Sequence, residues 1–217
     1  MTTKGELMKE ILLPWISAKN FLHEGDVLLF KGKGVMSYFI KRAGEGKYSH
    51  VGLVSAHPSN GSDPLWECVE FSEWKGGRTI NLERYVKQNS GLIDIYRPRD
   101  IYMNSFFNGK EIVDENITFQ PKRITNFMRK LTGLPHGWKR IIWIAQHKLP
   151  FLRLLYPIES IIENDENNQL VYPVCSTAVS YAFSRTGYQL LHNRADKATE
   201  PSDISRSPLL SYLFTIK

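Results

Sequence analysis

The stretch YPVCSTAVSYAFSRTG, residues 172–187, contains the most informative helix start in the chain. Pro173 ends an extended segment, and we expect a helix from about Cys175 to Arg185 that ends at Gly187. Apolar residues recur three, four, seven and eight positions after the cysteine, so Cys175 begins the buried stripe of this helix. The first helical turn has unpaired N–H groups and the positive end of the dipole, which stabilise a thiolate. A buried, inert cysteine is the alternative interpretation.

The segments before this helix show mainly strand patterns. We expect strands at 27–30, 50–55, 65–71, 79–80 and 92–96, and helices at 5–20, 35–42, 82–87 and 121–149, the last broken near 133–135. Residues 98–120 have no regular pattern. Because the strands come first and the helices later, without βαβ alternation, the predicted class is α+β. We expect one domain over residues 1–217, in which residues 1–22 form an N-terminal helical extension.

The composition supports one folded domain. The chain has 217 residues, of which 42% are hydrophobic, enough for a sizeable core, and this excludes disordered and coiled-coil proteins. Two cysteines make neither a disulfide framework nor a zinc motif, and no cofactor or metal is expected. Apolar runs reach only about five residues, too short for a membrane span, and no signal peptide is recognised. We expect a cytoplasmic protein, with packaging in a virion or signal-independent export as alternatives.

The positive charge is concentrated in one region. The net charge is +6, yet residues 121–156 contain eight Lys or Arg and no Asp or Glu, so the rest of the chain carries −2. Aromatic residues such as Trp138 and Trp143 are interleaved with these cations. This mixture suits an anionic polymer or an anionic membrane surface, and we do not expect nucleic acid as a partner. A solvated helix face is the alternative.

A histidine and a glutamate are candidates to work with the cysteine. His50 begins the predicted strand 50–55, although a lone histidine there is often structural. Glu67 lies among apolar residues on one face of strand 65–71, whereas Glu70 lies on the other face. A carboxylate in that position needs a partner, and a hairpin would bring His50 alongside. We therefore expect Glu67 to accept the imidazole N–H of His50 and orient the ring; a solvated sheet edge is the alternative for Glu67.

Four segments in this order resemble a known family. They are GDVLLF at 25–30, YSHVGLV at 48–54, WEC at 66–68 and VCSTAV at 174–179. They are similar to the circularly permuted papain-like amidases, the YiiX/YaeF-type branch of the NlpC-like cysteine peptidases. In that branch the histidine strand precedes the cysteine helix, as it does here. The resemblance covers roughly residues 24–97 and 133–206, including PSDI at 201–204, which resembles the family's closing segment.

The resemblance implies a fold and a set of site residues. The fold would be a permuted papain-like (NlpC-like) arrangement with a small antiparallel sheet packed against helices. Cys175 would be the nucleophile, His50 the base and Glu67 the third polar residue. The residues expected to contact substrate are Tyr48, Ser49, His136 and Ser176. His136 stands where the family often has a tyrosine, so a tyrosine role at that position does not carry over.

The implied activity is hydrolysis of an amide bond through a thioester. Peptide or isopeptide bonds, including those of cell-wall peptides, are the substrates that the family implies, and the backbone N–H of Cys175 would stabilise the oxyanion. A lipid-directed thiol acyltransferase or thioesterase of the lecithin:retinol type is an alternative that the basic stretch 121–156 favours. A catalytically silent binding module on the same fold is the third hypothesis.

Overall fold

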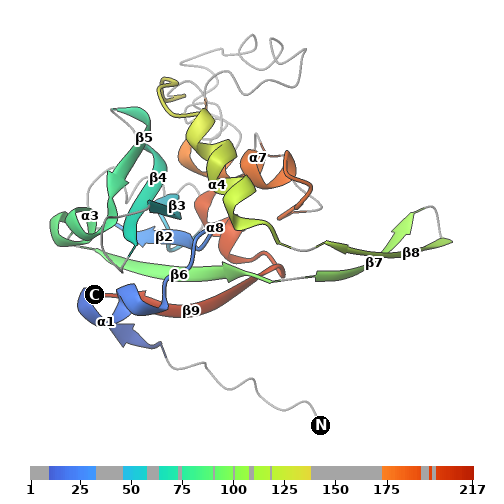
Figure 1. Ribbon diagram of the computed structural model, residues 1–217, viewed down its shortest axis with the longest axis horizontal. Helices are drawn as coiled ribbons and strands as arrows, with labels where there is room; N and C mark the ends of the chain where they lie inside the picture. The colour runs from blue at the N-terminus through green and yellow to red at the C-terminus, as the bar shows by residue number, and fades with distance from the viewer. Residues whose placement is uncertain are drawn as a thin grey trace, which may run out of the picture.

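The computed structural model contains one mixed seven-stranded sheet with helices on both faces (Figure 1). It describes residues 10–32, 46–57, 64–72, 75–89, 91–99, 101–107, 110–117, 119–137, 173–191, 196 and 199–217. The strands are β1 (Leu12–Leu13), β2 (Val27–Lys31), β3 (His50–His57), β4 (Leu65–Ser72), β5 (Gly76–Asn81), β6 (Leu92–Pro98), β7 (Ile101–Phe107), β8 (Lys110–Ile117) and β9 (Leu210–Ile216). The helices are α1 (Trp15–Ala18), the 3-10 helix η1 (Lys19–Phe21), α3 (Leu82–Gln88), α4 (Pro121–Lys130), α7 (Cys175–Ser184) and α8 (Pro201–Ser205).

The large sheet has the strand order β1-β9-β6-β2-β3-β4-β5, and β7 and β8 form a separate hairpin. Neighbouring strands of the large sheet are antiparallel, except that β1 runs parallel to β9. The α+β class predicted from the sequence is therefore confirmed. The sheet is larger than the expected small antiparallel sheet and is mixed. The C-terminal strand β9 pairs with β6, and β1 pairs with β9 as a parallel edge strand.

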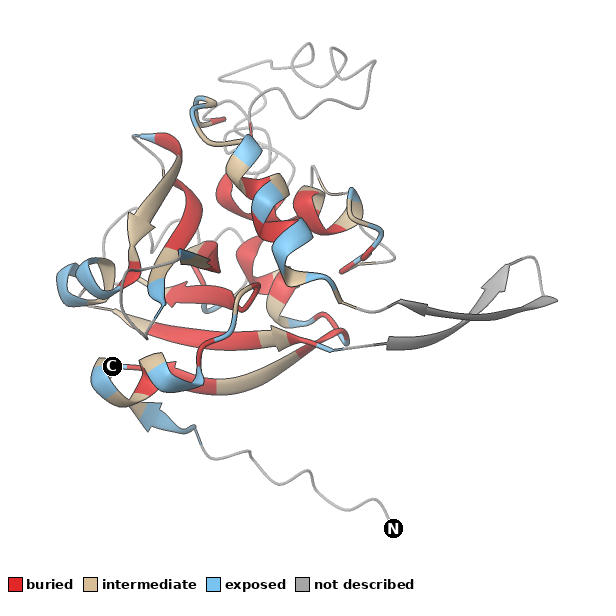
Figure 2. Cartoon of the chain, viewed as in Figure 1, coloured by how far each residue is buried: buried red, intermediate tan, exposed pale blue. Residues whose placement is uncertain are grey.

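Each face of the sheet has its own core and its own helices (Figure 2). Because side chains alternate along a strand, Leu29, Val51 and Val69 pack under α4, α7 and α8. On the opposite face, Leu28 and Cys68 pack against α1 and α3. The helix α7 is buried at eight of its ten residues, which fits a sequence of small and apolar residues without a charge. The helix α7 packs directly against β3 and β4, and the candidate site lies at this contact.

Several expected elements differ from the structure. The predicted helix 5–20 is correct only in part over its described residues: Leu12–Leu13 is a strand, and the helical residues of α1 and η1 begin after Pro14. Pro14 has an extended backbone and precedes the helix, as a residue without an N–H commonly does. Residues 101–107 and 110–117, for which the sequence shows no regular pattern, form the hairpin strands β7 and β8, which extend away from the large sheet (Figure 1). The expected helix 35–42 and the basic stretch beyond residue 137 lie outside the described residues.

Two glycines of β5 hold the segment that precedes His136. Gly77 donates its N–H to the carbonyl of Leu134 (2.9 Å) and accepts from the N–H of Gly133 (2.9 Å). A Cβ atom at Gly76 would overlap the Leu134 carbonyl oxygen, and Gly76 also has a positive φ of 66°. The close approach of two backbones thus requires glycine at this position.

We expect Gly76→Ala to lower the free energy of unfolding by about 1–3 kcal/mol more than Gly187→Ala. Gly187 also has a positive φ, but an added Cβ there meets nothing within 4 Å, so it isolates the backbone strain from the overlap. Urea unfolding of both variants measures the difference. Equal destabilisation would show that the segment at Leu134 moves aside without cost.

Candidate active site

His50 is held by a buried glutamate on the neighbouring strand. Its Nε2 lies 2.6 Å from Oε2 of Glu70, whose side chain is fully buried. In the β3–β4 register Glu70 pairs with Gly52, so His50 and Glu70 are diagonal neighbours on one face of the sheet. A Cβ at Gly52 would lie 3.3 Å from Cβ of Glu70 and still closer to Sγ of Cys68. Gly52 therefore leaves the space that the histidine–glutamate pair occupies.

Arg78 supports the other oxygen of the same carboxylate. Its Nε donates to Oε1 of Glu70 (2.7 Å), and its guanidinium lies over the ring of Tyr85 on α3. Arg78 pairs with Glu70 across the β4–β5 register, so two adjacent strand pairings determine both partners of the carboxylate. The buried charge of Glu70 is thus compensated on both oxygens, by His50 and by Arg78.

Cys175 is the first residue of α7 and lies beside His50. The helix start is fixed locally, because Thr177 Oγ1 accepts the N–H of Val174 (2.9 Å) and Val174 accepts the N–H of Ala178. The thiol of Cys175 is within hydrogen-bonding reach of the His50 imidazole. Since Nε2 of His50 is occupied by Glu70, Nδ1 is the nitrogen left for the thiol. His50 thus lies between the thiol of Cys175 and the carboxylate of Glu70, and these three side chains are called the Cys175–His50–Glu70 series.

Glu67, the residue expected to orient His50, does not contact it, and that prediction was wrong. Glu67 forms an ion pair with Arg129 of α4, which also donates to Ser55 Oγ. In the observed register Glu67 is opposite Ser55, five residues along β3 from His50. The alternation along β4 was assigned correctly, but His50 lies on the other face, the one it shares with Glu70.

The charges in this series shift the pKa values of both titrating partners. Burial alone would lower the pKa of His50, but the negative charges of Cys175 and Glu70, and hydrogen bonds to both, raise it from 6.5 to about 10. Burial would raise the pKa of Glu70, yet His50 and Arg78 together lower it from 4.5 to about 2. Both shifts favour an imidazolium at His50 that faces an ionised Glu70.

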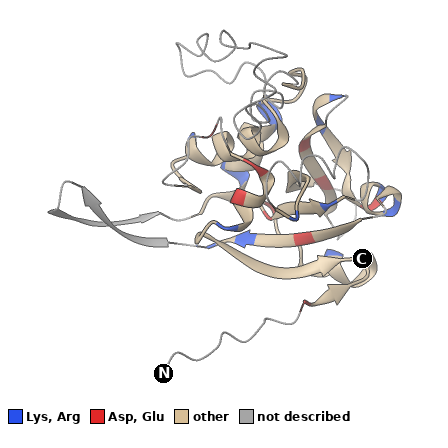
Figure 3. Cartoon of the chain, turned by 180° about the vertical axis from the view of Figure 1, so that it is seen from behind, with Lys and Arg blue, Asp and Glu red and all other residues tan. Residues whose placement is uncertain are grey.

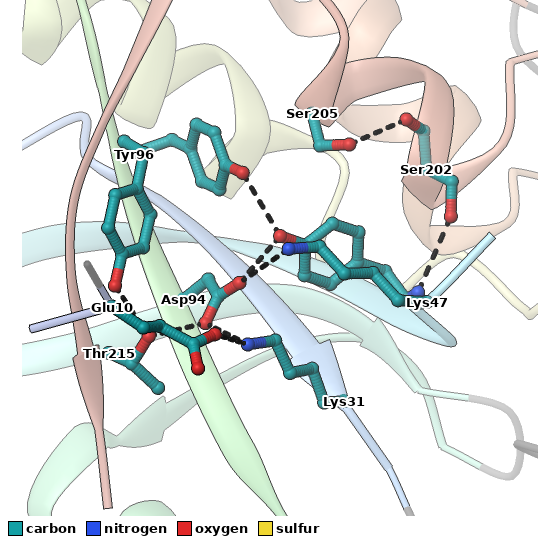
Figure 4. Close-up of polar contacts among 10 residues, drawn as sticks. Glu10, Lys31, Lys47, Asp94, Tyr96, Ser202, Ser205 and Thr215 are labelled. Carbon is teal, nitrogen blue, oxygen red and sulfur yellow. Dashed lines mark hydrogen bonds and ion pairs between the residues drawn. The ribbon is translucent and has the colours of Figure 1, made fainter. Parts of the chain in front are cut away.

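Tyr48, expected to contact substrate, has a structural role instead, and that expectation was wrong. Its side chain is 1% exposed, and its hydroxyl donates to Asp94 (2.6 Å). Asp94 is itself fully buried and also accepts from Thr215 and Lys31 (Figure 4). The backbone N–H of Tyr48 donates to Ser202 of α8 (3.4 Å). This network secures the residues immediately before His50.

The other three expected substrate contacts fall in different places. Ser176 is buried and donates to the carbonyl of Thr199 (2.6 Å), so its hydroxyl is not directed to a substrate, contrary to expectation. Ser49 donates to the Phe30 carbonyl but also lines the pocket beside His50. His136 is half-buried, and burial together with the charge of His50 lowers its pKa to about 4. His136 is thus a neutral ring close to His50.

Glu70 and Arg78 were the residues that sequence reasoning missed. A signal for Glu70 existed: it is the other carboxylate of the same strand, on the face opposite Glu67. Choosing between the two glutamates required the β3–β4 register, because a shift of one residue exchanges the faces. No sequence pattern pointed to Arg78, because the β4–β5 register decides that it lies opposite Glu70.

Comparison with known proteins identifies a fold and no family. No family model matches the chain, and no curated protein matches it. Among solved structures, the chain is similar to the crystal structure of the metalloprotein yiiX from Escherichia coli O157:H7, with a TM-score of 0.53 and 11% sequence identity. The match covers 88% of this chain and 96% of that chain. At this identity the similarity shows a shared fold alone.

The described part of the chain has neither a cluster of metal-ligating side chains nor a membrane-spanning helix. There, no group of three or more His, Cys, Asp and Glu side chains is arranged to hold a metal ion. Within the same residues, no helix combines the length and the apolar character needed to cross a bilayer.

We expect Glu70→Gln to lower the pKa of His50 by at least about one unit, because it removes an opposite charge in contact with the ring. The ion pair of His50 and Glu70 makes its full contribution to the free energy of unfolding between about pH 4.5 and 6.5, the ordinary pKa values of the two groups. This contribution is lost as pH falls through the lowered pKa of Glu70, or rises through the raised pKa of His50. NMR titration of the imidazole in a Cys175→Ala background measures the shift.

Glu67→Gln is the matched control for this titration, since it changes a glutamate of the same strand that contacts Arg129. It should leave the pKa of His50 unchanged. An equal drop in both variants, or no drop in Glu70→Gln, would contradict the pairing of His50 with Glu70.

Proposed function

We propose that this protein is a thiol hydrolase of permuted papain-like architecture that cleaves amide bonds of peptide-like substrates. The observation that carries the proposal is the series Cys175–His50–Glu70, with Cys175 at a helix start and His50 between the thiol and a buried carboxylate. This is the nucleophile, base and orienting group of a cysteine amidase. The order of these residues along the chain, and the fold shared with yiiX, support the permuted arrangement.

The chemical steps follow from the positions of these side chains. The thiolate of Cys175 attacks the amide carbonyl, and the negative charge moves to the carbonyl oxygen. The backbone N–H of Cys175, the first of its helix, has no intrahelical acceptor and can donate to that oxygen. His50 then gives its proton to the departing amine, which leaves a thioester on Cys175. A water molecule, deprotonated by His50, attacks the thioester and releases the carboxylic acid and the thiolate.

Glu70 contributes by fixing the ring and stabilising its charged form. Its hydrogen bond to Nε2 leaves Nδ1 directed to the thiol, and its charge favours the imidazolium that pairs with the thiolate. Arg78 keeps the carboxylate ionised and in place from the other side. Cys68 has no such role, because it is fully buried and burial raises the pKa of its thiol.

The test is turnover of a fluorogenic peptide library by the parent and four variants. Cys175→Ala should abolish turnover, and His50→Ala should lower kcat/KM by at least about 10³-fold. The double variant His50→Ala/Glu70→Gln should be no slower than His50→Ala, because groups that act as a unit are not additive. Glu67→Gln is the control and should retain turnover.

The outcomes separate the alternatives. If the double variant is clearly slower than His50→Ala, Glu70 does not act through His50. If no peptide is cleaved and iodoacetamide modifies Cys175 no faster than Cys68, the chain is a binding module and the proposal fails. Mass spectrometry locates the modified thiol in the intact protein.

A basic surface on α4 favours substrate capture on an anionic support. Lys122, Arg123 and Lys130 are exposed on this helix, whereas Arg129 is engaged by Glu67. Figure 3 colours the Lys and Arg positions of the described chain blue. The three exposed cations line a groove of about 890 Å³ whose aromatic members include Phe119. Exposed cations beside aromatic side chains suit a lipid surface, which keeps a lipid-directed acyltransferase as the second candidate function.

We expect the protein to co-sediment with vesicles that contain phosphatidylglycerol and not with pure phosphatidylcholine vesicles. Binding should weaken several-fold when salt is raised from 50 to 300 mM, since exposed charges are screened. Replacing Lys122, Arg123 and Lys130 by alanine should reduce binding, while the exposed Lys87→Ala should not. Equal binding to both vesicle types would exclude charge-driven capture through α4.

A further inference from the structure

An aromatic side chain supports the imidazole of the candidate base. Phe30 of β2 is the direct cross-strand neighbour of His50, and the centroids of the two rings are 5.2 Å apart. Phe30 is buried and also packs against Tyr85 of α3, with ring centroids 5.1 Å apart. Aromatic rings on neighbouring strands attract each other in preferred orientations. Phe30 thus connects the histidine ring with α3 and limits the orientations that the histidine ring adopts.

Tyr85 contacts the other half of the histidine–glutamate pair. Its hydroxyl is hydrogen-bonded to the carboxylate of Glu70. Burial, and then the charge of Glu70, raise the pKa of Tyr85 well above its ordinary value, so the hydroxyl keeps its proton and donates it to this bond. The guanidinium of Arg78, which holds the same carboxylate, lies 5.9 Å from the centre of the Tyr85 ring. The carboxylate is therefore contacted from β3 by His50, from β5 by Arg78 and from α3 by Tyr85.

The local sequence decides where Tyr85 lies. The helix α3 follows β5 without a loop, because the side chain of Asn81 caps it by accepting the backbone N–H of Arg84 (2.9 Å). Leu82 is fully buried, and Tyr85, three positions later on the same helix face, packs on the same core. The direct passage from β5 into α3 thus brings Tyr85 back over Arg78.

We infer that Phe30 and Tyr85 are positioning residues for the histidine–glutamate pair, Phe30 through the imidazole and Tyr85 through the carboxylate. The site then depends on both faces of the sheet, because α7 supplies the thiol from one face and α3 supports the base from the other. Neither residue forms or breaks a bond, and both act on how closely the pair keeps its geometry. The catalytic consequence rests on the proposed amidase function, whereas the positioning itself is observable without turnover.

The first experiment observes the hydrogen bond between His50 and Glu70 by NMR in a Cys175→Ala background. The Nε2 proton of His50 is the probe, because the contact is short (2.6 Å) and the carboxylate is fully buried. Tyr85→Phe keeps the ring and removes only the hydroxyl, so this proton should exchange with water at least about ten-fold faster, as expected for losing one hydrogen bond to a charged group. Phe30→Leu should accelerate the exchange as well, because the histidine ring loses its aromatic neighbour.

Tyr188→Phe is the matched control. It removes the hydroxyl of a second buried tyrosine, which donates to the backbone carbonyl of Arg99 and belongs to the core on the α7 face. It should lower the free energy of unfolding, measured in urea, and leave the exchange of the Nε2 proton of His50 unchanged. If Tyr85→Phe is destabilised but its Nε2 proton exchanges as in this control, Tyr85 has only a structural role and the inference fails.

The second experiment measures turnover of a fluorogenic peptide by the same variants with Cys175 restored. Tyr85→Phe and Phe30→Leu should each lower kcat/KM about ten-fold, while Tyr188→Phe keeps the parent value. The loss in Tyr85→Phe should be much smaller in a Glu70→Gln background, since the two residues act as a unit. Faster proton exchange without any turnover supports the positioning and overturns the amidase proposal. Turnover and exchange that match those of Tyr188→Phe overturn the inference and leave the amidase proposal intact.

Discussion

The buried carboxylate of Glu70 is the group on which the site depends. An ionised side chain with no exposure is costly by several kcal/mol unless both oxygens are compensated, and here His50 and Arg78 do so. Each partner comes from a different neighbouring strand, so the carboxylate is tolerated only in one combination of registers. The same contacts that compensate the buried charge of Glu70 also hold the imidazole of His50 beside the thiol of Cys175.

The positions around this carboxylate are secured from two sides. On one side, Asp94 collects Tyr48, Lys31 and Thr215 into a buried network, which fixes the backbone just before His50. On the other, the glycines at the start of β5 hold the Leu134 backbone, which leads to His136. Hydrogen bonds within a well-packed frame leave a side chain little freedom, which is the preorganisation that the proposed nucleophile and base would require.

The positive charge of the described chain is distributed unevenly around this frame. On the α4 side of the sheet, Arg129 is neutralised by Glu67, and the remaining exposed cations face a groove away from His50. On the α3 side, the cations Lys75 and Arg84 share a cavity with His50. The sheet therefore separates two basic regions: one shares a cavity with His50, and the other lies on the face where α4 and α7 pack.

The sequence by itself determined the α+β class, the helix that begins at Cys175, the strand that begins at His50, and the face of β4 that each glutamate occupies. These features depend on local patterns, the 3.6-residue and two-residue periods and the helix-ending glycine. Tertiary structure alone decided that Glu70, and not Glu67, contacts His50. It also decided that Tyr48 and Ser176 form buried structural hydrogen bonds, and that β9 pairs with β6 in the sheet. Strand register and long-range pairing follow from packing of the whole core, and a register shift of one residue reverses every side chain while leaving the local pattern unchanged.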